Sequence, residues 1–373
     1  MNVPLLDLVA QYETIRDDVQ AAMRGVCETQ RFILGETVER FERDVADYCG
    51  VRHAIGVSSG TDALLAALMV ACVGPGAEVI LPPFTFFATA GTVSRLGARP
   101  VFADIRADSF NIDPARVEQA MTPRTRAIMP VDLFGQPAEM EAIREIAARH
   151  QVMVIEDAAQ AIGATRRGRR VGQMADMTCL SFFPTKNLGG FGDGGMILTD
   201  DDDLARRCRM TRVHGAEREY HHVFVGGNFR LDALQAAVLA VKLRRLDGWI
   251  EARRANAARY NERLEGSGVV TPAESAHNRH TYHQYTIRVP GGRRDALAAH
   301  LKSAGVATKI YYPVCLHQQE CFRGLGHARG DFPESERAAD EVLSLPMYPE
   351  LREEQITYVA RCIREFMSGR RAN

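Results

Sequence analysis

Short apolar segments alternate with amphipathic segments along the first half of the chain. The apolar segments are rich in valine and isoleucine, have the length of strands, and cover residues 53–59, 77–82, 98–104, 125–131 and 152–157. The segments between them have helical spacing and begin near Thr61, Thr85, Pro114 and Pro137. This alternation predicts an α/β fold in which a mostly parallel sheet is sandwiched by helices.

Helical patterns flank this alternating region. They cover residues 12–28 and 36–49 before it and, after two more apolar strands at 177–183 and 194–200, residues 201–213, 231–246 and 248–264. A GSG sequence at 266–268 and the stretch 272–279 then interrupt the pattern. A smaller α+β unit follows, with strands expected at 281–289 and 306–312 and helices at 293–304 and 353–367. We therefore predict an N-terminal arm and a large domain over residues 1–247, and a long linking helix with a small C-terminal domain over 248–373.

Composition is that of an ordinary globular protein. Of the 373 residues, 46% are apolar and 25% are charged, and the formal net charge is −1, so nothing favours binding to nucleic acid or to a membrane. The longest apolar run, Ala63 to Val73, is too short to cross a bilayer, and the first residues lack the pattern of a secretion signal. The eight cysteines are scattered without a CxxC pair or metal-ligand spacing, which predicts the cytoplasm and no metal site.

Lys186 occupies a tight glycine-rich turn, LSFFPTKNLGGFGDGG, directly after an apolar strand. A lysine held between core segments loses hydration, which lowers the pKa of its amine and makes it a nucleophile able to form a Schiff base with an aldehyde cofactor. The alternative is a solvated lysine in a surface hairpin. Gly190, Gly192 and Gly195 match GxGxxG, but a strand follows them, so a dinucleotide fingerprint is rejected.

Other chemical groups follow the predicted strands, where ligands of such sheets bind. Ser58 to Asp62 joins a strand to a helix, and its free N–H groups with the Thr61 hydroxyl could hold a phosphate, although a plain helix cap is the simpler interpretation. Asp157 ends a buried strand and needs a cationic partner, such as a protonated pyridine nitrogen, or else caps the next helix. Phe86 could lie against a flat cofactor or simply fill the core.

The order of these motifs resembles that of a known family. GTDAL, PPFTFFATA, VIEDAAQA, SFFPTKNLG and GGNFRLDALQAAVL resemble the pyridoxal-phosphate sugar-nucleotide aminotransferases, the DegT/DnrJ/StrS family, over nearly the whole chain. Each motif alone is weak, but the ordered set is specific. The resemblance implies the aspartate-aminotransferase-like fold, fold type I, and a homodimer with shared active sites.

The resemblance also implies a role for each matching residue. Lys186 would be the Schiff-base lysine and Asp157 the partner of the pyridine nitrogen, while Gln160 would contact the ring hydroxyl and Phe86 would stack on the ring. Gly60, Thr61 and Ser181 would hold the phosphate, joined by Asn228 from the neighbouring subunit. Candidates for contacts with the sugar nucleotide are His214, Arg230, Tyr312 and His317. This chain has Tyr311-Tyr312-Pro313 where many members have His-Tyr-Pro, and Cys315 at a frequent proline, so it departs from the family at the substrate contacts.

The implied activity is amine transfer from glutamate to a nucleotide-linked keto sugar, with pyridoxamine phosphate as the intermediate form of the cofactor. The stretch around Lys186 resembles the members that aminate carbon 3, because Phe183 and Pro184 stand where members acting on carbon 4 often have histidine. A UDP-linked substrate is favoured, with 2-acetamido-3-keto-glucuronate as the specific candidate; the alternative is a dTDP-linked 3-keto-6-deoxyhexose.

Three further alternatives stay open: a 4-aminotransferase, a pyridoxal-phosphate sugar dehydratase and a non-catalytic regulator. The dehydratase would have histidine at position 186. A Rossmann-type oxidoreductase is disfavoured, because no GxGxxG joins a strand to a helix.

Overall fold

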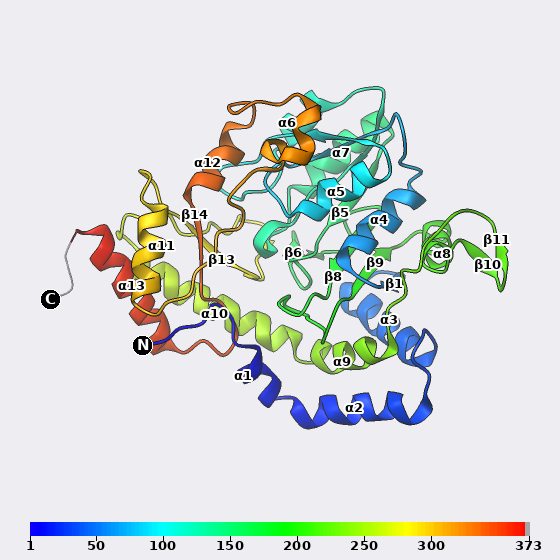
Figure 1. Ribbon diagram of the computed structural model, residues 1–373, viewed down its shortest axis with the longest axis horizontal. Helices are drawn as coiled ribbons and strands as arrows, with labels where there is room; N and C mark the ends of the chain where they lie inside the picture. Colours follow the sequence, from blue (N-terminus) through cyan, green and yellow to red (C-terminus); the bar gives the residue numbers. More distant parts are fainter. Residues whose placement is uncertain (370–373) are drawn as a thin grey trace.

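The computed structural model describes residues 1–369, which are arranged around a seven-stranded sheet (Figure 1). The strand order is β1 (His53–Val57), β9 (Gly195–Thr199), β8 (Met177–Ser181), β5 (Met153–Asp157), β4 (Thr125–Ile128), β2 (Glu78–Leu81) and β3 (Arg99–Phe102). Strands β8, β5, β4, β2 and β3 pair in parallel, and β9 runs antiparallel to both β1 and β8. The predicted mostly parallel sheet is therefore confirmed, and the strand after Gly192 rules out a dinucleotide fingerprint there.

Helices cover both faces of this sheet. One core cluster packs α3 (Glu36–Cys49), α6 (Pro114–Ala120), α7 (Met140–His150) and α9 (Ala233–Leu243) against side chains such as Val154 and Leu180. The other packs α4 (Gly60–Val70), α5 (Phe87–Arg95) and α8 (Asp202–Thr211) against side chains such as Ile155 and Cys179. Neighbouring strand residues thus face opposite layers, as the pleat requires. Outside these layers, α1 (Leu8–Glu13) leads into α2 (Arg16–Thr29), which packs on α9.

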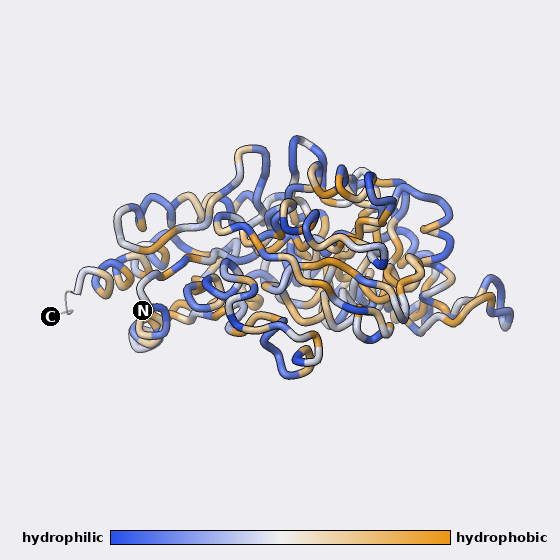
Figure 2. Tube along the Cα trace, turned by 90° about the horizontal axis from the view of Figure 1, so that it is seen from above, coloured by the Kyte–Doolittle hydropathy of each residue, from blue (hydrophilic) through white to orange (hydrophobic). Residues whose placement is uncertain are grey.

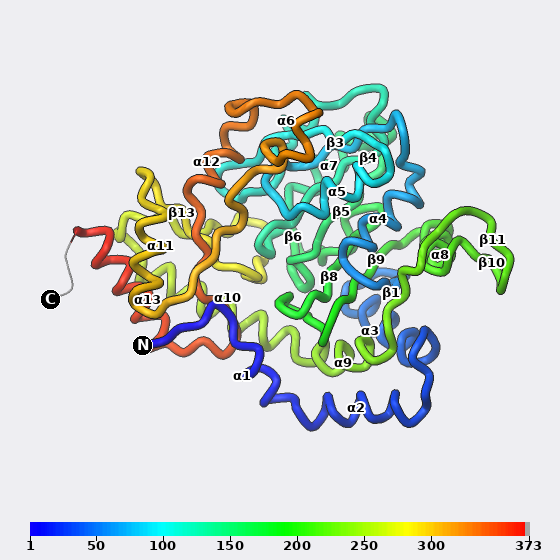
Figure 3. The backbone as a smooth tube through the Cα atoms, viewed as in Figure 1, coloured from blue at the N-terminus to red at the C-terminus, as the bar shows by residue number. Residues whose placement is uncertain are grey.

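A separate core lies at the other end of the long helix α10 (Leu246–Leu264), seen at the left of Figure 1. Helices α11 (Arg294–Ser303) and α13 (Glu353–Met367) belong to this part, together with the antiparallel pair β13 (Tyr285–Arg288) and β14 (Val342–Leu345). Val3 is buried in the same core, and the N-terminal segment runs beside the C-terminal half of the chain (Figure 3). The predicted domain boundary falls in the first turns of α10 and stays a prediction.

In this region one predicted strand is absent, and two elements are present that the sequence did not predict. Residues 306–312 form no regular strand, because they make only isolated bridges, Val3 to Val306 and Lys309 to Ser344, before the chain crosses to the large sheet. The helix α12 (Pro333–Glu341) and the strand β14, which pairs with β13, were not predicted.

Smaller elements complete the fold. β6 (Thr165–Arg166), β7 (Arg169–Arg170) and β12 (Asn278–Arg279) form a short sheet, and β10 (Ala216–Arg218) and β11 (His221–His222) form a hairpin that projects from the body (Figure 1). In the view turned by 90°, apolar segments run through the centre and polar segments dominate the outer loops (Figure 2). Within residues 1–369, no helix is both long and apolar enough to cross a membrane, and no cluster of three or more metal-ligating side chains is present.

Candidate active site

Lys186 lies in a turn beyond the carboxyl end of β8. Its N–H donates to the carbonyl oxygen of Phe183 over 2.8 Å, which closes the turn. Gly189 follows so closely that a Cβ atom there would collide with the Pro184 carbonyl, so only glycine fits this approach. From α9, the buried Lys242 donates from Nζ to the Gly189 carbonyl oxygen over 2.6 Å and fixes the turn from the other side.

The Lys186 amine has Asp157 as its ionic neighbour. Burial lowers the pKa of the Lys186 ammonium to about 8, and the negative charge of Asp157 opposes this effect. Asp157 is buried at the end of β5, where burial raises the pKa of its carboxyl group. Hydrogen bonds from Thr89 Oγ1 at 2.8 Å and from the Ala159 N–H at 3.3 Å oppose that rise and favour the carboxylate. The structure therefore combines an amine of lowered basicity with a buried carboxylate that forms no ion pair within residues 1–369.

The helix α4 begins beside this pair. Ser59 caps the helix by accepting from the Asp62 N–H over 3.0 Å, and the first turn leaves N–H groups of Gly60 and Thr61 outside the helical bonding pattern. Ser181, at the end of β8, lies against Gly60, where a Cβ atom would come within 2.6 Å of the Ser181 Cβ. The N-terminus of the helix and the Ser181 hydroxyl thus form a small site suited to a phosphate.

Gln160, Tyr312 and Phe86 lie along one side of the same region. Gln160 Oε1 accepts from the Phe134 N–H over 2.6 Å, and its Nε2 donates to the Tyr312 hydroxyl over 3.3 Å. The Phe86 ring lies 6.2 Å from the Tyr312 ring and is 57% exposed, so it is not a core residue. An exposed aromatic ring one helical turn before Thr89, which bonds to the buried Asp157 carboxylate, suits a flat, phosphorylated pyridine aldehyde.

Two predicted substrate residues, His214 and Arg230, and the predicted phosphate contact Asn228 lie on the two segments that carry the projecting hairpin. His214 and Asn228 are exposed on the two facing sides of its base, where Asn228 bridges to Val213. Arg230 is partly buried and bridges to Val57, so it lies beside the strand that leads into α4. A buried ion pair between Arg212 and Glu42 anchors the base of the hairpin to α3.

His317 is not placed as a substrate contact, contrary to the sequence prediction. It is 2% exposed, and its Nε2 lies 3.0 Å from Glu336 Oε1 among the rings of Phe102 and Phe332. The resemblance alone named His317 as a candidate, and a match of motifs does not show which way a side chain points. Here a short 3-10 turn, Leu316–Gln318, directs this ring into the core.

Sequence reasoning also missed supporting residues. Thr89, which holds Asp157, lies one helical turn after Phe86, so i, i+3 spacing could have revealed it. Asn187 and His283 are buried together, with His283 Nδ1 at 3.3 Å from Asn187 Oδ1, and they tie the turn of Lys186 to the segment before β13. No local pattern signals this contact, because it joins distant parts of the chain.

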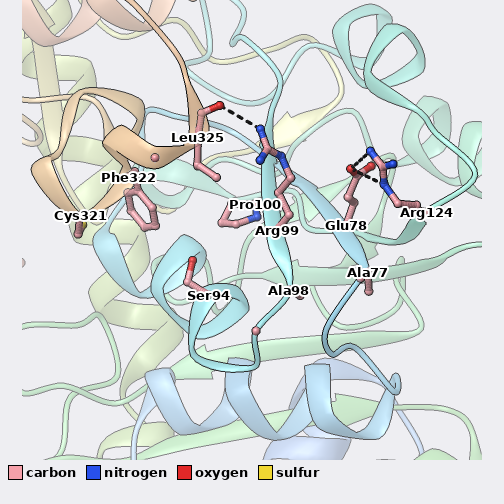
Figure 4. A pocket seen from close by; sticks show the side chains of 13 residues that line it. Ala77, Glu78, Ser94, Ala98, Arg99, Pro100, Arg124, Cys321, Phe322 and Leu325 are labelled. Carbon is pink, nitrogen blue, oxygen red and sulfur yellow. Dashed lines mark hydrogen bonds and ion pairs between the residues drawn. The ribbon is translucent and has the colours of Figure 1, made fainter.

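A cavity of about 610 Å³ lies elsewhere, at the amino-terminal ends of β2 and β3 (Figure 4). Its two arginines are already engaged, Arg124 with Glu78 and Arg99 with the Leu325 carbonyl oxygen. Because ligands of parallel sheets bind at the carboxyl ends of the strands, this cavity is not the candidate active site.

Comparison with known proteins agrees with this geometry. The model of the DegT/DnrJ/EryC1/StrS aminotransferase family matches residues 13–364. A protein of Geobacillus stearothermophilus named pleiotropic regulatory protein is 54% identical over 98% of this chain and 99% of its own. UDP-N-acetyl-3-dehydro-α-D-glucosamine 3-aminotransferase of Acidithiobacillus ferrooxidans is 44% identical over 98% of both chains.

Two findings come from Streptomyces venezuelae. The dTDP-3-amino-3,4,6-trideoxy-α-D-glucose transaminase is 44% identical over 98% of this chain and 96% of its own. A crystal structure of DesV in complex with a ketimine intermediate matches with a TM-score of 0.96 at 44% identity, and covers 100% of both chains.

Proposed function

This chain belongs to the DegT/DnrJ/EryC1/StrS aminotransferase family, whose members are pyridoxal-phosphate-dependent transaminases, and we propose that it transfers an amino group from glutamate to carbon 3 of a nucleotide-linked keto sugar. The observation that carries the proposal is the Lys186 amine, with its pKa lowered to about 8, beside the buried Asp157 carboxylate. When bound, pyridoxal phosphate supplies an aldehyde for the amine and a protonated ring that accepts electrons.

Lys186 has two tasks in this proposal. Its amine would hold the cofactor covalently in the resting enzyme and, once freed, would move a proton at the carbon of the donor or of the sugar. A pKa of about 8 suits this work, because both protonation states are populated near neutral pH. The bonds to the Phe183 carbonyl and from Lys242 fix the backbone of the turn from which this side chain extends.

Asp157 holds the ring nitrogen in its protonated form. An ionised carboxylate buried at the end of β5 stabilises a cation at that place, and Thr89 and Ala159 keep the carboxylate ionised and oriented. Gln160 would contact the ring hydroxyl, and Phe86 would stack on the ring. Gly60, Thr61 and Ser181 would hold the phosphate, joined by Asn228 from a second copy of the chain.

The substrate is proposed to be UDP-linked, with a 2-acetamido-3-keto sugar as the favoured acceptor and its glucuronate form as the specific candidate. The Acidithiobacillus relative supports a UDP-linked 3-keto sugar, and the Streptomyces relative at equal identity supports the alternative, a dTDP-linked 3-keto-6-deoxyhexose. Phe183 and Pro184 before the lysine support carbon 3 over carbon 4. Arg230, His214 and Tyr312 are the proposed contacts, and Arg230 can grip a diphosphate or a sugar carboxylate through a bidentate bond.

The test runs the reaction backward. The purified protein is offered 2-oxoglutarate with UDP- or dTDP-linked 3-amino and 4-amino sugars, with and without a carboxylate at carbon 6, and glutamate is measured. We expect glutamate from the UDP-linked 3-amino sugars. Efficient deamination of only the 4-amino sugars would contradict the carbon 3 assignment, and activity with dTDP but not UDP sugars would reverse the choice of nucleotide.

A purely regulatory role is the second candidate, because the 54% identical relative is named a regulatory protein. The same preparation distinguishes the two roles. A transaminase shows the visible absorbance of lysine-bound pyridoxal phosphate and loses it on addition of glutamate, whereas a regulator that does not use the cofactor shows neither change.

A further inference from the structure

Two fully buried carboxyl groups lie directly behind the cofactor-facing end of β5. Glu156 precedes Asp157 in the strand, so its side chain points to the opposite face of the sheet. Asp132 follows β4, and its N–H donates to the Asp157 carbonyl oxygen over 3.0 Å. Both side chains are 0% exposed, and neither has a role in the site proposed above.

In each of these carboxyl groups, one oxygen accepts a hydrogen bond and the other has no donor within residues 1–369. Asp132 Oδ1 accepts from the Ala138 N–H over 2.9 Å, and Glu156 Oε2 accepts from the Thr178 hydroxyl over 2.6 Å. Asp132 Oδ2 and Glu156 Oε1 have no donor within residues 1–369. The two side chains influence the protonation of each other, and both orphan oxygens are buried, so a single proton between them would satisfy both oxygens.

We propose that Asp132 and Glu156 share one proton and act as a positioning pair for Gln160 and Asp157. Asp132 carries the proton and donates it to Glu156. Glu156 is the better place for the negative charge, because the Thr178 hydroxyl and the Gly172 N–H already donate to it and Arg169 lies within electrostatic range. Asp132 has only the Ala138 N–H and also feels the charge of Asp157.

The pair holds a strained turn that supports the cofactor site. Asp132 opens the turn 132–138, in which Phe134 has a φ of 59°, a conformation that costs energy for a residue with a side chain. Such a conformation persists only where surrounding bonds fix it. In this strained position, the Phe134 N–H donates to Gln160 Oε1 over 2.6 Å. Loss of the bond between Asp132 and Glu156 would therefore release the Phe134 N–H, which orients Gln160. The connection from the pair to the cofactor rests on the proposed function.

The charges around the pair determine its pH dependence. The titratable and charged groups facing it are Asp157 in β5, Arg169 in β7, Cys49 in α3 and Cys179 in β8. Burial, followed by the charge of Glu156, raises the pKa of Asp132 well above its usual range. The pKa of Asp132 is thus higher in the folded protein than in the unfolded chain. Its contribution to the free energy of unfolding is therefore complete at low pH. This contribution is lost as pH rises from the ordinary aspartate range through the pKa of the folded protein.

Infrared difference spectra of the full-length protein test the shared proton directly. With carbon-13-labelled aspartate, we expect at neutral pH an isotope-shifted carbonyl band from a protonated carboxyl group. The band should disappear in Asp132→Asn and shift in frequency in Glu156→Gln, where the proton loses its carboxylate acceptor. It should remain unchanged in Asp176→Asn, whose carboxylate is partly exposed and bound to the Val154 N–H. Absence of the band from the wild-type protein at neutral pH would overturn the proposal.

Rescue by the conservative variant tests the positioning role. Asp132→Asn keeps a donor toward Glu156 and should bind pyridoxal phosphate within about threefold of the wild-type affinity, whereas Asp132→Ala should bind it about tenfold more weakly. As pH rises from about 5 to 7, above the ordinary aspartate range, the thermal midpoint of the wild type should fall relative to that of Asp132→Asn. Equal binding loss in both variants, or no relative change in midpoint with pH, would overturn the positioning role. Failure of the wild type to bind the cofactor would refute the proposed function, while the infrared band would still test the shared proton.

Discussion

The two halves of the candidate active site are built differently. Lys186, Asp157 and Gln160 are attached to neighbouring strand ends of one sheet, and each is held by hydrogen bonds or by tight packing within a single chain. His214, Asn228 and Arg230 lie at the base of a projecting hairpin, where His214 and Asn228 are exposed and few bonds fix their side chains (Figure 1). The reacting half is thus preorganised. The other half is open: its His214 and Arg230 are the proposed substrate contacts, and its Asn228 is the proposed phosphate contact for a second copy of the chain.

This difference shows how the fold separates chemistry from specificity. Groups that move protons or stabilise charge must keep one geometry, and burial on a rigid sheet supplies it. Groups that recognise a variable sugar and nucleotide can be changed on a projecting segment without disturbing the sheet. Substitutions in the two halves should therefore have different kinetic consequences.

The largest effect is expected from Lys186→Ala. Removal of the amine takes away both the covalent attachment and the proton transfer, so the turnover rate should fall by about a thousandfold or more, while pyridoxal phosphate still binds through its phosphate and ring. Steady-state transamination and cofactor content measure the two effects. Lys302→Ala, at an exposed position in α11, is the matched control and should keep full activity. More than a trace of turnover in Lys186→Ala would remove Lys186 from this role.

Asp157→Asn should come next, with a loss of about a hundredfold in the turnover rate. The amide fills the same space and can still bond to Thr89, but it carries no charge to keep the ring nitrogen protonated. Thr89→Val, which removes only the supporting hydrogen bond, should cost about tenfold or less. A near-normal rate in Asp157→Asn would mean that the carboxylate only caps the chain after β5.

The pH dependence of cofactor loading should show about a tenfold effect. With a Lys186 pKa of about 8, the neutral amine increases roughly tenfold between pH 7 and 9, so the rate of loading should rise over this range and level off above it. Stopped-flow absorbance of cofactor-free protein mixed with pyridoxal phosphate measures the rate. A profile that continues to rise steeply toward the pKa of a solvated lysine would show that burial does not lower the pKa of this amine.

The smallest effect is expected in the open half. Arg230→Ala removes a proposed contact that binds the substrate equally well in the ground state and in the transition state. KM for the nucleotide sugar should therefore rise about fivefold with little change in kcat. Arg230→Lys should recover only part of this, because lysine cannot form the bidentate contact. A fall in kcat without a change in KM would place Arg230 in the reacting half instead.

The reacting half is also the half that sequence reasoning anticipated best. Lys186, Asp157 and Ser59 to Thr61 each follow a short apolar strand, and parallel sheets gather such strand ends at one edge, so local pattern was enough to bring these residues together. The helices on both faces followed from spacing in the same way.

The remaining features depend on contacts between distant segments. His317 was named as a substrate contact from the resemblance alone, but a 3-10 turn buries it against Glu336. The pairing of β13 with β14 and the contact between Asn187 and His283 join residues far apart in the chain, and no local periodicity records them. The segment 306–312 has the composition of a strand, yet it makes only isolated bridges.

Hybrid dimers test most directly the claim that one chain supplies the reacting half and a second chain completes the site. Lys186→Ala and Asn228→Asp chains, carrying different tags, are expressed together, and the hybrid is purified through both tags. If sites are shared, one of the two sites is intact, and the hybrid should have about half of the wild-type activity although each parent is impaired. The control hybrid of Lys186→Ala with Asp157→Asn should be no more active than the Asp157→Asn parent, because both residues belong to the same half. A Lys186→Ala/Asn228→Asp hybrid no more active than its parents, or an active monomer in sedimentation, would contradict the account.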